Sequence, residues 1–478
     1  MNIEELNIIQ IQDAFDDGEF SSKELTFYYL NRIAKYDQAG PKLNSILEIN
    51  PDAVHIADAL DYERRTLGPR SLLHGIPILM KDNIDTADKM HTSAGSLALQ
   101  NHYAKKDAWV IQQLRKAGAV ILGKTNMTEW ANFMADNMPA GYSSRGGQVK
   151  NPYGKHFTPG GSSAGSGVAV AAGLAVAAVG TETSGSILSP ASQNGIVGIK
   201  PTIGMISRTG IIPISHTQDT AGPMTRNVTD AAVLLNYLQG IDQEDPITRI
   251  NPILSTDLRL SLREDGLTHK RIGIARTPYF HELSNSHKKA LDHSIDTLKR
   301  LGAIVVDPIE IQIPESFNNI EVMLHEFKVG IEGYLNTVDA KLGIHTLADI
   351  INQNKMIGHD ALVYGQQVLV KADKTSGNLT EPTYLRALEN DQRDARKNGI
   401  DAVVEENNLD AILFPSYKGA LISAKAGYPS ITVPSGFCET DGPIGITFTG
   451  KSFTEPQLLE IAYAYESGVE SDWKVNLK

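Results

Sequence analysis

The N-terminal part of the chain places apolar residues at helical spacing. Between positions 25 and 36, leucine, tyrosine and isoleucine side chains recur every three or four residues, which is typical of a helix with one apolar face. The run Ser21-Ser22-Lys23-Glu24 just before them fits a capping box, in which side chains bond the backbone at the start of a helix. We therefore predict a surface helix over 25–36 that covers a core.

Helical and strand patterns alternate in the next part of the chain. The apolar run 74–80 predicts a short buried strand that leads into Lys81. A helix is expected over 108–117, a strand over 119–122 and a helical segment over 128–134. Such alternation indicates an α/β sheet whose strands are joined by crossover helices.

Core-like material returns near the C-terminus, after a more polar middle. Residues 240–400 carry charged helical patterns and predict peripheral helices with one pair of strands. Apolar runs at both ends of the chain favour one large domain, 1–478, with 240–400 as a variable, mainly helical peripheral region within it. The further strands are expected over 271–275, 303–306, 411–414, 430–433 and 444–448, and a last helix over 455–465.

Composition narrows the class of protein. The 478 residues are 41% hydrophobic and 21% charged, which is globular usage and excludes disorder, collagen and coiled coil. The net charge of −12 argues against a nucleic-acid or anionic-membrane partner. The single cysteine, Cys438, cannot form an intramolecular disulfide, and the acidic N-terminus lacks the basic start of a signal peptide. We therefore expect a cytoplasmic location.

One segment is unusually rich in small residues. Between 157 and 199, Glu182 is the single charged residue among many Gly, Ser, Ala and Thr. Its most apolar part, 168–180, is 13 residues long, whereas a transmembrane helix needs about 20. We predict a buried helix over 168–180, approached by a glycine-rich loop whose N–H groups can point at a bound group.

Two motif matches in this region are rejected on their context. Residues 118–125 match the phosphate-binding pattern G-x-x-x-x-G-K-[ST], but the variable positions are Ala-Val-Ile-Leu, which predict a strand rather than a loop. Residues 161–165 match G-x-S-x-G, the nucleophile elbow, yet the residues before them predict a loop instead of the strand that an elbow needs. No H-E-x-x-H or similar metal-ligand pattern occurs, so we expect no metal.

Three residues together point to nucleophilic catalysis. Lys81 follows a buried strand, Ser162 lies in the glycine-rich loop, and Ser186 follows the small-residue segment. Lysine can serve as the base in variants of serine hydrolase chemistry. A lysine at a buried strand end loses solvation, which lowers its pKa and allows it to accept a proton near neutral pH.

These residues lie in segments that resemble the amidase signature family. The matching segments are 75–83, 160–166, 180–187 and 195–202, and Ser162 and Ser186 are separated by 24 positions, as in that family's Ser-Ser-Lys triad. Residues 128–133 and 141–153 look most like the peptide amidase branch.

The resemblance implies a fold and a set of roles. The fold is a mixed, mostly parallel twisted sheet covered by helices. Ser186 is then the nucleophile, Ser162 the bridging serine and Lys81 the base, with an oxyanion hole formed by the N–H groups of Thr183, Ser184, Gly185 and Ser186. The expected activity is hydrolysis of peptide-like or linear aliphatic carboxamides through an acyl-enzyme. No cofactor is expected, and a homodimer is compatible with a chain of this size.

Two departures from the family pattern keep alternatives open. Many relatives have Gly-Gly-Ser-Ile-Arg around the nucleophile, whereas this chain has Ser184 and Leu188 in that motif. Leu188 counts against the ammonia-releasing A subunit of a glutamyl-tRNA amidotransferase, which is the second enzymatic hypothesis. A non-catalytic binding protein of the same fold is the third hypothesis, and retention of all three chemical groups counts against it.

Overall fold

The fold is built on one large mixed β-sheet. The structure is a computed structural model that describes residues 2–281, 283–469, 475 and 477. Within these residues an 11-stranded sheet has the order β1-β3-β2-β6-β8-β7-β12-β13-β11-β9-β10. Its strands are β1 (Ile46–Ile49), β2 (Pro77–Lys81), β3 (Val120–Thr125), β6 (Ala177–Glu182), β7 (Val197–Lys200), β8 (Thr220–Thr225), β9 (Arg271–Thr277), β10 (Ile304–Glu310), β11 (Ala411–Pro415), β12 (Ser430–Cys438) and β13 (Gly442–Thr449).

Parallel pairs occur in two groups of this sheet. Strands β3, β2 and β6 are parallel to one another, and so are β11, β9 and β10. The strands between these groups pair antiparallel, because β12 and β13 form a hairpin and β8 runs opposite to both of its neighbours. The α/β class is confirmed. The expected parallel pairing holds within the two groups, whereas antiparallel pairs run through the middle of the sheet.

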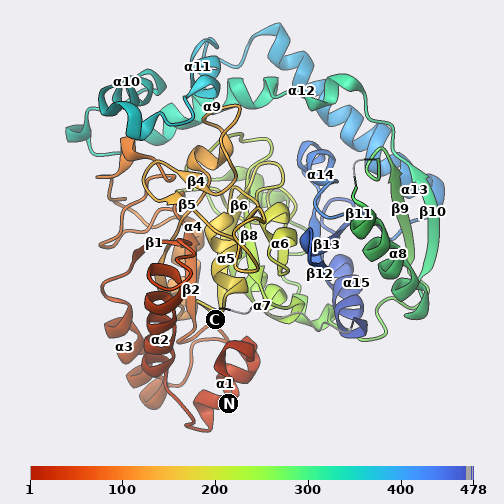
Figure 1. Ribbon diagram of the computed structural model, residues 1–478, viewed down its shortest axis with the longest axis horizontal. Helices are drawn as coiled ribbons and strands as arrows, with labels where there is room; N and C mark the ends of the chain where they lie inside the picture. Colours follow the sequence, from red (N-terminus) through yellow and green to blue (C-terminus); the bar gives the residue numbers. More distant parts are fainter. Residues whose placement is uncertain (1, 282, 470–474, 476, 478) are drawn as a thin grey trace.

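Helices surround the sheet in distinct groups (Figure 1). Helices α5 and α6 pack on the middle strands, α7 and α15 contact each other beside them, and α9 to α12 form an arch at one edge of the molecule. The helices are α1 (Ile8–Asp16), α2 (Ser22–Arg32), α3 (Ala53–Leu67), α4 (Trp109–Ala117), α5 (Ala164–Ala171), α6 (Leu188–Gln193), α7 (Val228–Leu238), α8 (Asn285–Arg300), α9 (Glu321–Leu335), α10 (Leu347–Ile357), α11 (Gln367–Asp373), α12 (Pro382–Ala395), α13 (Asp401–Asn407), α14 (Ala420–Ala426) and α15 (Glu455–Gly468).

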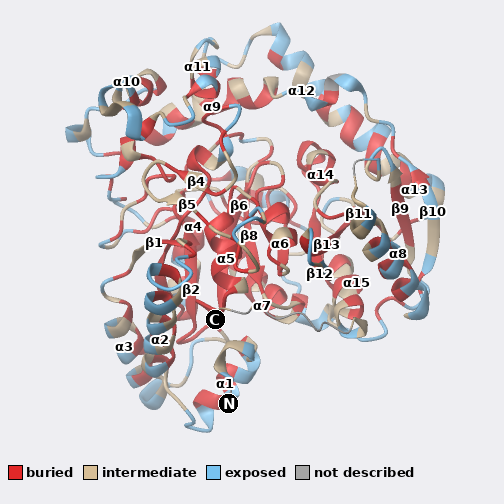
Figure 2. Ribbon diagram, viewed as in Figure 1, coloured by how far each residue is buried: buried red, intermediate tan, exposed pale blue. Residues whose placement is uncertain are grey.

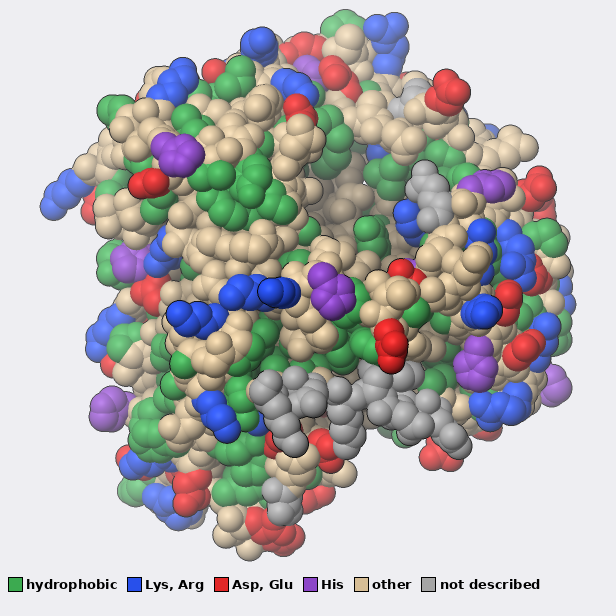
Figure 3. Space-filling model, in the orientation of Figure 1, with side chains coloured by type: hydrophobic (Ala, Val, Ile, Leu, Met, Phe, Trp, Pro, Cys, Tyr) green, Lys and Arg blue, Asp and Glu red, His purple; other side chains and the backbone are tan. Residues whose placement is uncertain are grey.

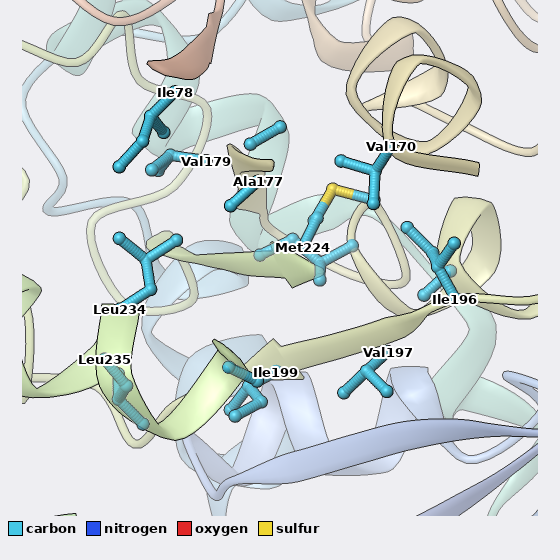
Figure 4. Packing of buried hydrophobic residues seen from close by; sticks show 14 of the residues in the cluster. Ile78, Val170, Ala177, Val179, Ile196, Val197, Ile199, Met224, Leu234 and Leu235 are labelled. Carbon is cyan, nitrogen blue, oxygen red and sulfur yellow. The ribbon is translucent and has the colours of Figure 1, made fainter. Parts of the chain in front are cut away.

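The core lies where these helices meet the middle strands. Figure 2 shows buried residues concentrated in α5, β6, β8 and α6. In Figure 4, Val170 of α5, Met224 of β8 and Leu234 of α7 lie in one apolar cluster, and all three are fully buried. Burying one such side chain contributes about 1.5–3 kcal/mol. Ile78 of β2 and Val179 of β6 belong to the same cluster, which therefore fixes the two strands whose ends carry the candidate site.

The predicted helix over 168–180 is wrong from residue 172 onward. Helix α5 ends at Ala171, and residues 177–182 form strand β6 instead. Gly173 has φ +62°, and the Arg32 side chain donates to the carbonyl oxygens of Ala172 and Gly173, so the helix is capped there. Small apolar residues suit a buried strand as well as a buried helix. No helix in the described part of the chain is both long and apolar enough to span a membrane.

The predicted helix over 128–134 is also wrong. Residues Glu129–Asn132 form a short turn in which Trp130, Ala131 and Asn132 all have positive φ. The backbone N–H of Trp130 donates to the carbonyl of Ala94. The indole ring is buried edge-on against Phe327. These tertiary contacts override the helical pattern of the sequence.

The other predicted elements are confirmed, with shifted ends. The capping box at Ser21 and Glu24 is present and starts α2, which continues as a π-helix over Ile33–Gln38. The strands expected at 271–275 and 303–306 pair side by side as β9 and β10. Residues 120–125 of the rejected phosphate-binding match form β3, which is buried throughout.

Gly165 in the first turn of α5 allows the helix to approach two backbone segments. A Cβ atom at this position would lie 2.3 Å from the carbonyl oxygens of both Asn126 and Ser45. The Gly165 N–H donates to the Asn126 oxygen at 2.9 Å. Close packing of α5 against the backbone therefore explains this glycine.

We expect Gly165→Ala to lower the free energy of unfolding by about 1–3 kcal/mol, because neither backbone oxygen can yield without moving a strand end. Gly333→Ala is the matched control, since Gly333 lies within α9 and a Cβ there meets nothing within 4 Å. That change should raise stability by about 0.5–1 kcal/mol. Urea unfolding of both variants measures this, and equal midpoints would contradict the packing argument.

Candidate active site

Lys81 lies at the end of β2, in the interior of the sheet. Its side chain is fully buried, and its Nζ lies 2.8 Å from Ser162 Oγ. The same nitrogen donates to the carbonyl oxygen of Thr181 at 3.1 Å and to Thr181 Oγ1 at 2.8 Å. Thr181 is placed there because β6 runs parallel to β2 with Met80 opposite Val179. Asn83 Nδ2 donates to the same threonine hydroxyl at 3.0 Å.

Ser162 lies in the glycine-rich loop before α5. The Gly161-Ser162 peptide bond is cis, and Gly160 has φ +65°. A side chain at Gly160 would also meet the backbone of Pro190 at 2.6 Å, so the loop approaches α6 closely. The Ser162 carbonyl accepts from the N–H of Thr128 at 3.0 Å. Residues 155–160 form no strand, which agrees with the rejection of the nucleophile elbow.

Ser186 lies in a tight loop between β6 and α6. This loop is tied to the loop of Ser162, because the backbone N–H of Ser163 donates to the Ser186 carbonyl at 3.0 Å. Gly185 has φ +84°, a conformation that L side chains rarely adopt. Ser186 is 7% exposed, while Lys81 and Ser162 are 0% exposed, so Ser186 is the member of the three that solvent can reach.

The carboxylate of Glu182 binds the backbone at the C-terminal end of this loop. Its Oε2 accepts from the N–H of Ile187 at 2.6 Å and from the N–H of Leu188 at 2.9 Å. These are the two residues that follow Ser186, and Glu182 itself is almost fully buried. A buried carboxylate that accepts two N–H groups fixes the backbone around it. The position of Ser186 is therefore set by the last residue of β6.

The carboxylate of Asp219 binds the N-terminal end of the same loop. Its Oδ1 accepts from the hydroxyl of Thr183 at 2.5 Å. Its Oδ2 accepts from the N–H groups of Ile214 and Ser215, at 2.7 and 2.8 Å. Asp219 thus joins the first residue of the loop 183–186 to the segment that precedes β8.

Burial has the largest effect on the pKa values of Lys81 and Asp219. Desolvation lowers the pKa of Lys81 to about 7, although the nearby charges of Glu182 and Asp219 act in the opposite direction. Desolvation also raises the pKa of Asp219 to about 6, against the hydrogen bonds from Thr183, Ile214 and Ser215. A lysine whose pKa is about 7 is neutral in part of its population at neutral pH, and a neutral amine can accept a proton.

A cavity of about 240 Å³ lies beside the start of the loop 183–186, and its lining includes Glu182 and Asp219 but not Lys81, Ser162 or Ser186. Thr181 and Thr183 line it, together with Asn83 from the segment after β2 and Ala131 from the left-handed turn. The molecular face drawn in Figure 3 is hollowed beneath the arch of α9 to α12. Among the described residues, no group of His, Cys, Asp and Glu side chains is arranged to hold a metal ion.

The structure places Lys81 in contact with Ser162 and ties the Ser186 carbonyl to the backbone of Ser163, but sequence reasoning missed the residues that hold these groups. Thr181, Glu182 and Asp219 all contact the triad or its loop. Glu182 carried a signal, because it is the single charge between 157 and 199. Asp219 lies 33 positions after Ser186 and carried none that differs from an ordinary surface acid.

Comparisons with known proteins agree with this geometry. The family model Amidase matches residues 24–423. A probable amidase of Arabidopsis thaliana is 41% identical, over 97% of this chain and 90% of the relative. The crystal structure of native peptide amidase from Stenotrophomonas maltophilia is 44% identical, covers 97% of this chain and 96% of its own, and superposes with a TM-score of 0.92.

One relative of lower identity is named as an amidotransferase and not as an amidase. It is the glutamyl-tRNA(Gln) amidotransferase A chain of Pseudomonas fluorescens, which is 33% identical over 98% of each chain. All of these similarities span both ends of the sheet and the segments that hold Lys81, Ser162 and Ser186. The chain belongs to the amidase family, whose members hydrolyse carbon-nitrogen bonds of linear amides.

Proposed function

We propose that the chain hydrolyses carboxamides through an acyl-enzyme on Ser186, with Ser162 as the bridging serine and Lys81 as the base. The contact of 2.8 Å between Lys81 Nζ and Ser162 Oγ carries this proposal. Two hydrogens of a neutral amine are engaged by Thr181 O and Oγ1. Its lone pair is then left to face Ser162, which is the orientation that a base needs.

In the acylation step, Ser186 Oγ attacks the amide carbonyl carbon and forms the new C–O bond. The Ser186 proton passes to Ser162, and the Ser162 proton passes to Lys81. The C–N bond then breaks, and the leaving nitrogen takes a proton back along the same path as ammonia or an amine. Water, deprotonated by the same relay, then attacks the ester carbonyl carbon. The C–O bond to Ser186 breaks, Ser186 takes a proton back from the relay, and the carboxylate leaves.

The loop 183–186 supplies the proposed oxyanion hole. The donors are the N–H groups of Thr183, Ser184, Gly185 and Ser186, and Glu182 and Asp219 hold the two ends of the loop. Donors fixed before the reaction need not reorganise as negative charge develops, and each is typically worth about 2.7–4 kcal/mol in the transition state. The glycine at 185 leaves room for a carbonyl oxygen to approach the backbone.

Peptide-like or linear aliphatic amides are the proposed substrates. The similarity to the peptide amidase of Stenotrophomonas maltophilia supports the first class. A second candidate is glutamine hydrolysis within an amidotransferase complex, which the similarity to the Pseudomonas fluorescens protein supports. Identity is higher to the peptide amidase, at 44% against 33%, so amide hydrolysis by this chain alone is the function that we favour.

Replacement of the three proposed catalytic residues tests the mechanism. Ser186→Ala should abolish ammonia release from a dipeptide amide and covalent labelling by a fluorophosphonate, because the attacking oxygen is gone. Ser162→Ala and Lys81→Ala should lower kcat by about 10²–10⁴-fold, since proton transfer is lost. Ser163→Ala tests the nucleophile elbow and should keep covalent labelling, with kcat lowered less than in Ser162→Ala, because the Ser163 hydroxyl bonds to the backbone of Thr181, which engages Lys81. Loss of labelling in Ser163→Ala with labelling intact in Ser186→Ala would support the nucleophile elbow instead.

The protonation of Lys81 predicts a specific pH profile. Below a pKa of about 7 the lysine is an ammonium group without a lone pair, so kcat/KM should fall as pH decreases through 7 and reach a plateau above it. The rate of fluorophosphonate labelling should follow the same limb, because it needs the same activated oxygen. A profile that is flat from about pH 5.5 to 8.5 would contradict Lys81 as the base.

The two candidate functions differ in substrate and in partners. We expect the purified chain alone to release ammonia from peptide amides with a higher kcat/KM than from free glutamine. An ammonia-release assay over a panel of amides measures this. Preference for glutamine, together with stoichiometric copurification of other proteins, would favour the amidotransferase function.

A further inference from the structure

Helix α9 contacts the segment that follows Lys81 and two further segments, which in turn bond to the loops of Ser162 and Ser186. Tyr334 OH donates to Asp85 at 2.7 Å, four residues after Lys81. Phe327 packs against Trp130, which follows the Thr128 that holds the Ser162 carbonyl. Phe327 and Tyr334 are seven residues apart, which is two helical turns, so they share one face of α9.

Glu326 on the same helix contacts residues 215–217, which lie just before Asp219. Its Oε2 accepts from the hydroxyl of Ser215, from the N–H of Thr217 at 3.2 Å and from the hydroxyl of Thr217 at 2.9 Å. Its Oε1 accepts from Tyr384 OH of α12 at 2.9 Å, and His216 Nε2 lies 3.4 Å away. Glu326 is 1% exposed, so this carboxylate is buried among its partners.

These contacts continue to the proposed oxyanion hole through Asp219. Ser215, which donates its hydroxyl to Glu326, also donates its N–H to Asp219 Oδ2 at 2.8 Å. Asp219 Oδ1 in turn accepts from the Thr183 hydroxyl at 2.5 Å. A chain of hydrogen bonds therefore runs from the helical arch to the first residue of the loop 183–186.

We propose that Glu326 is a positioning residue for amide hydrolysis, which acts through Ser215 and Asp219 on the placement of the Thr183 N–H. This rests on the proposed function, because it assigns Glu326 a task in the same oxyanion hole. The chemistry favours a carboxylate at this position. Both of its oxygens accept, from three donors on one side and a phenol on the other, whereas an amide has one acceptor oxygen and must turn an NH₂ group toward one set of partners.

The first experiment compares Glu326→Gln with a matched change on the same helix. Glu326→Gln should lower kcat for a dipeptide amide by about tenfold or more, because small displacements of a transition-state donor are costly. KM should stay within about twofold, since the loss is confined to the transition state. Glu332→Gln is the control. Glu332 makes one long contact, 3.4 Å to the N–H of Leu347, and its variant should match the wild type.

A double-mutant cycle tests the route. Thr183→Val removes the hydroxyl that binds Asp219 and keeps the volume and the backbone N–H. If Glu326 acts through this link, Thr183→Val and Glu326→Gln should be non-additive, and the double variant should be about as slow as the slower single variant. Independent structural damage would instead multiply the two losses.

The outcomes separate the proposals. Slow turnover with unchanged KM and non-additivity supports the positioning role, whereas Glu326→Gln behaving like Glu332→Gln, or additive losses, overturns it. If Glu326→Gln does not fold, Thr217→Val removes one of the donors and should give the same kcat effect in weaker form. If the wild type hydrolyses no amide, the proposed function fails by itself. The rate of fluorophosphonate labelling of Ser186 then still tests Glu326, because the phosphonyl oxygen needs the same loop.

Discussion

The contact between Lys81 and Ser162 depends on two features of the surrounding structure, which are burial of the lysine and hydrogen-bond partners for its nitrogen. A lysine can act as a base near neutral pH only if its charged form is disfavoured, and burial supplies that condition here. Complete burial in turn requires partners for the nitrogen, which Thr181 provides from the neighbouring strand. The absence of charge between 157 and 199, apart from Glu182, follows from the same constraint, since each added charge nearby would shift the pKa of the lysine again.

The two carboxylates near the site show how this constraint is balanced. Glu182 and Asp219 fix the loop 183–186 from both sides, which a neutral acceptor would do less strongly. Their negative charges favour the ammonium form of Lys81 and so oppose the role of base that we propose for it. Desolvation exceeds this effect, because the pKa of Lys81 is lowered overall. Desolvation also raises the pKa of Asp219, which reduces its charge near pH 6.

The sequence pattern correctly predicted those helices and strands whose conformation is set by neighbouring residues in the chain. The capping box at Ser21 starts α2, and the apolar run before Lys81 forms β2. The failures occurred where distant contacts decide. Residues 177–182 form a strand because β2 and β8 flank them, and Trp130 adopts a left-handed conformation because Ala94 and Phe327 hold it. For the site, the motifs predicted Lys81, Ser162 and Ser186, whereas the contact of Asp219 with the loop 183–186 depends on the folded chain.

The residue after Ile187 illustrates why the loop can keep its geometry while the sequence around it changes. Leu188 stands where many relatives carry arginine, yet its task in the loop is performed by its backbone N–H, which donates to Glu182. Any residue except proline can supply that N–H. The Leu188 side chain is uncharged and fully buried. A difference at 188 therefore leaves the placement of Ser186 to Glu182.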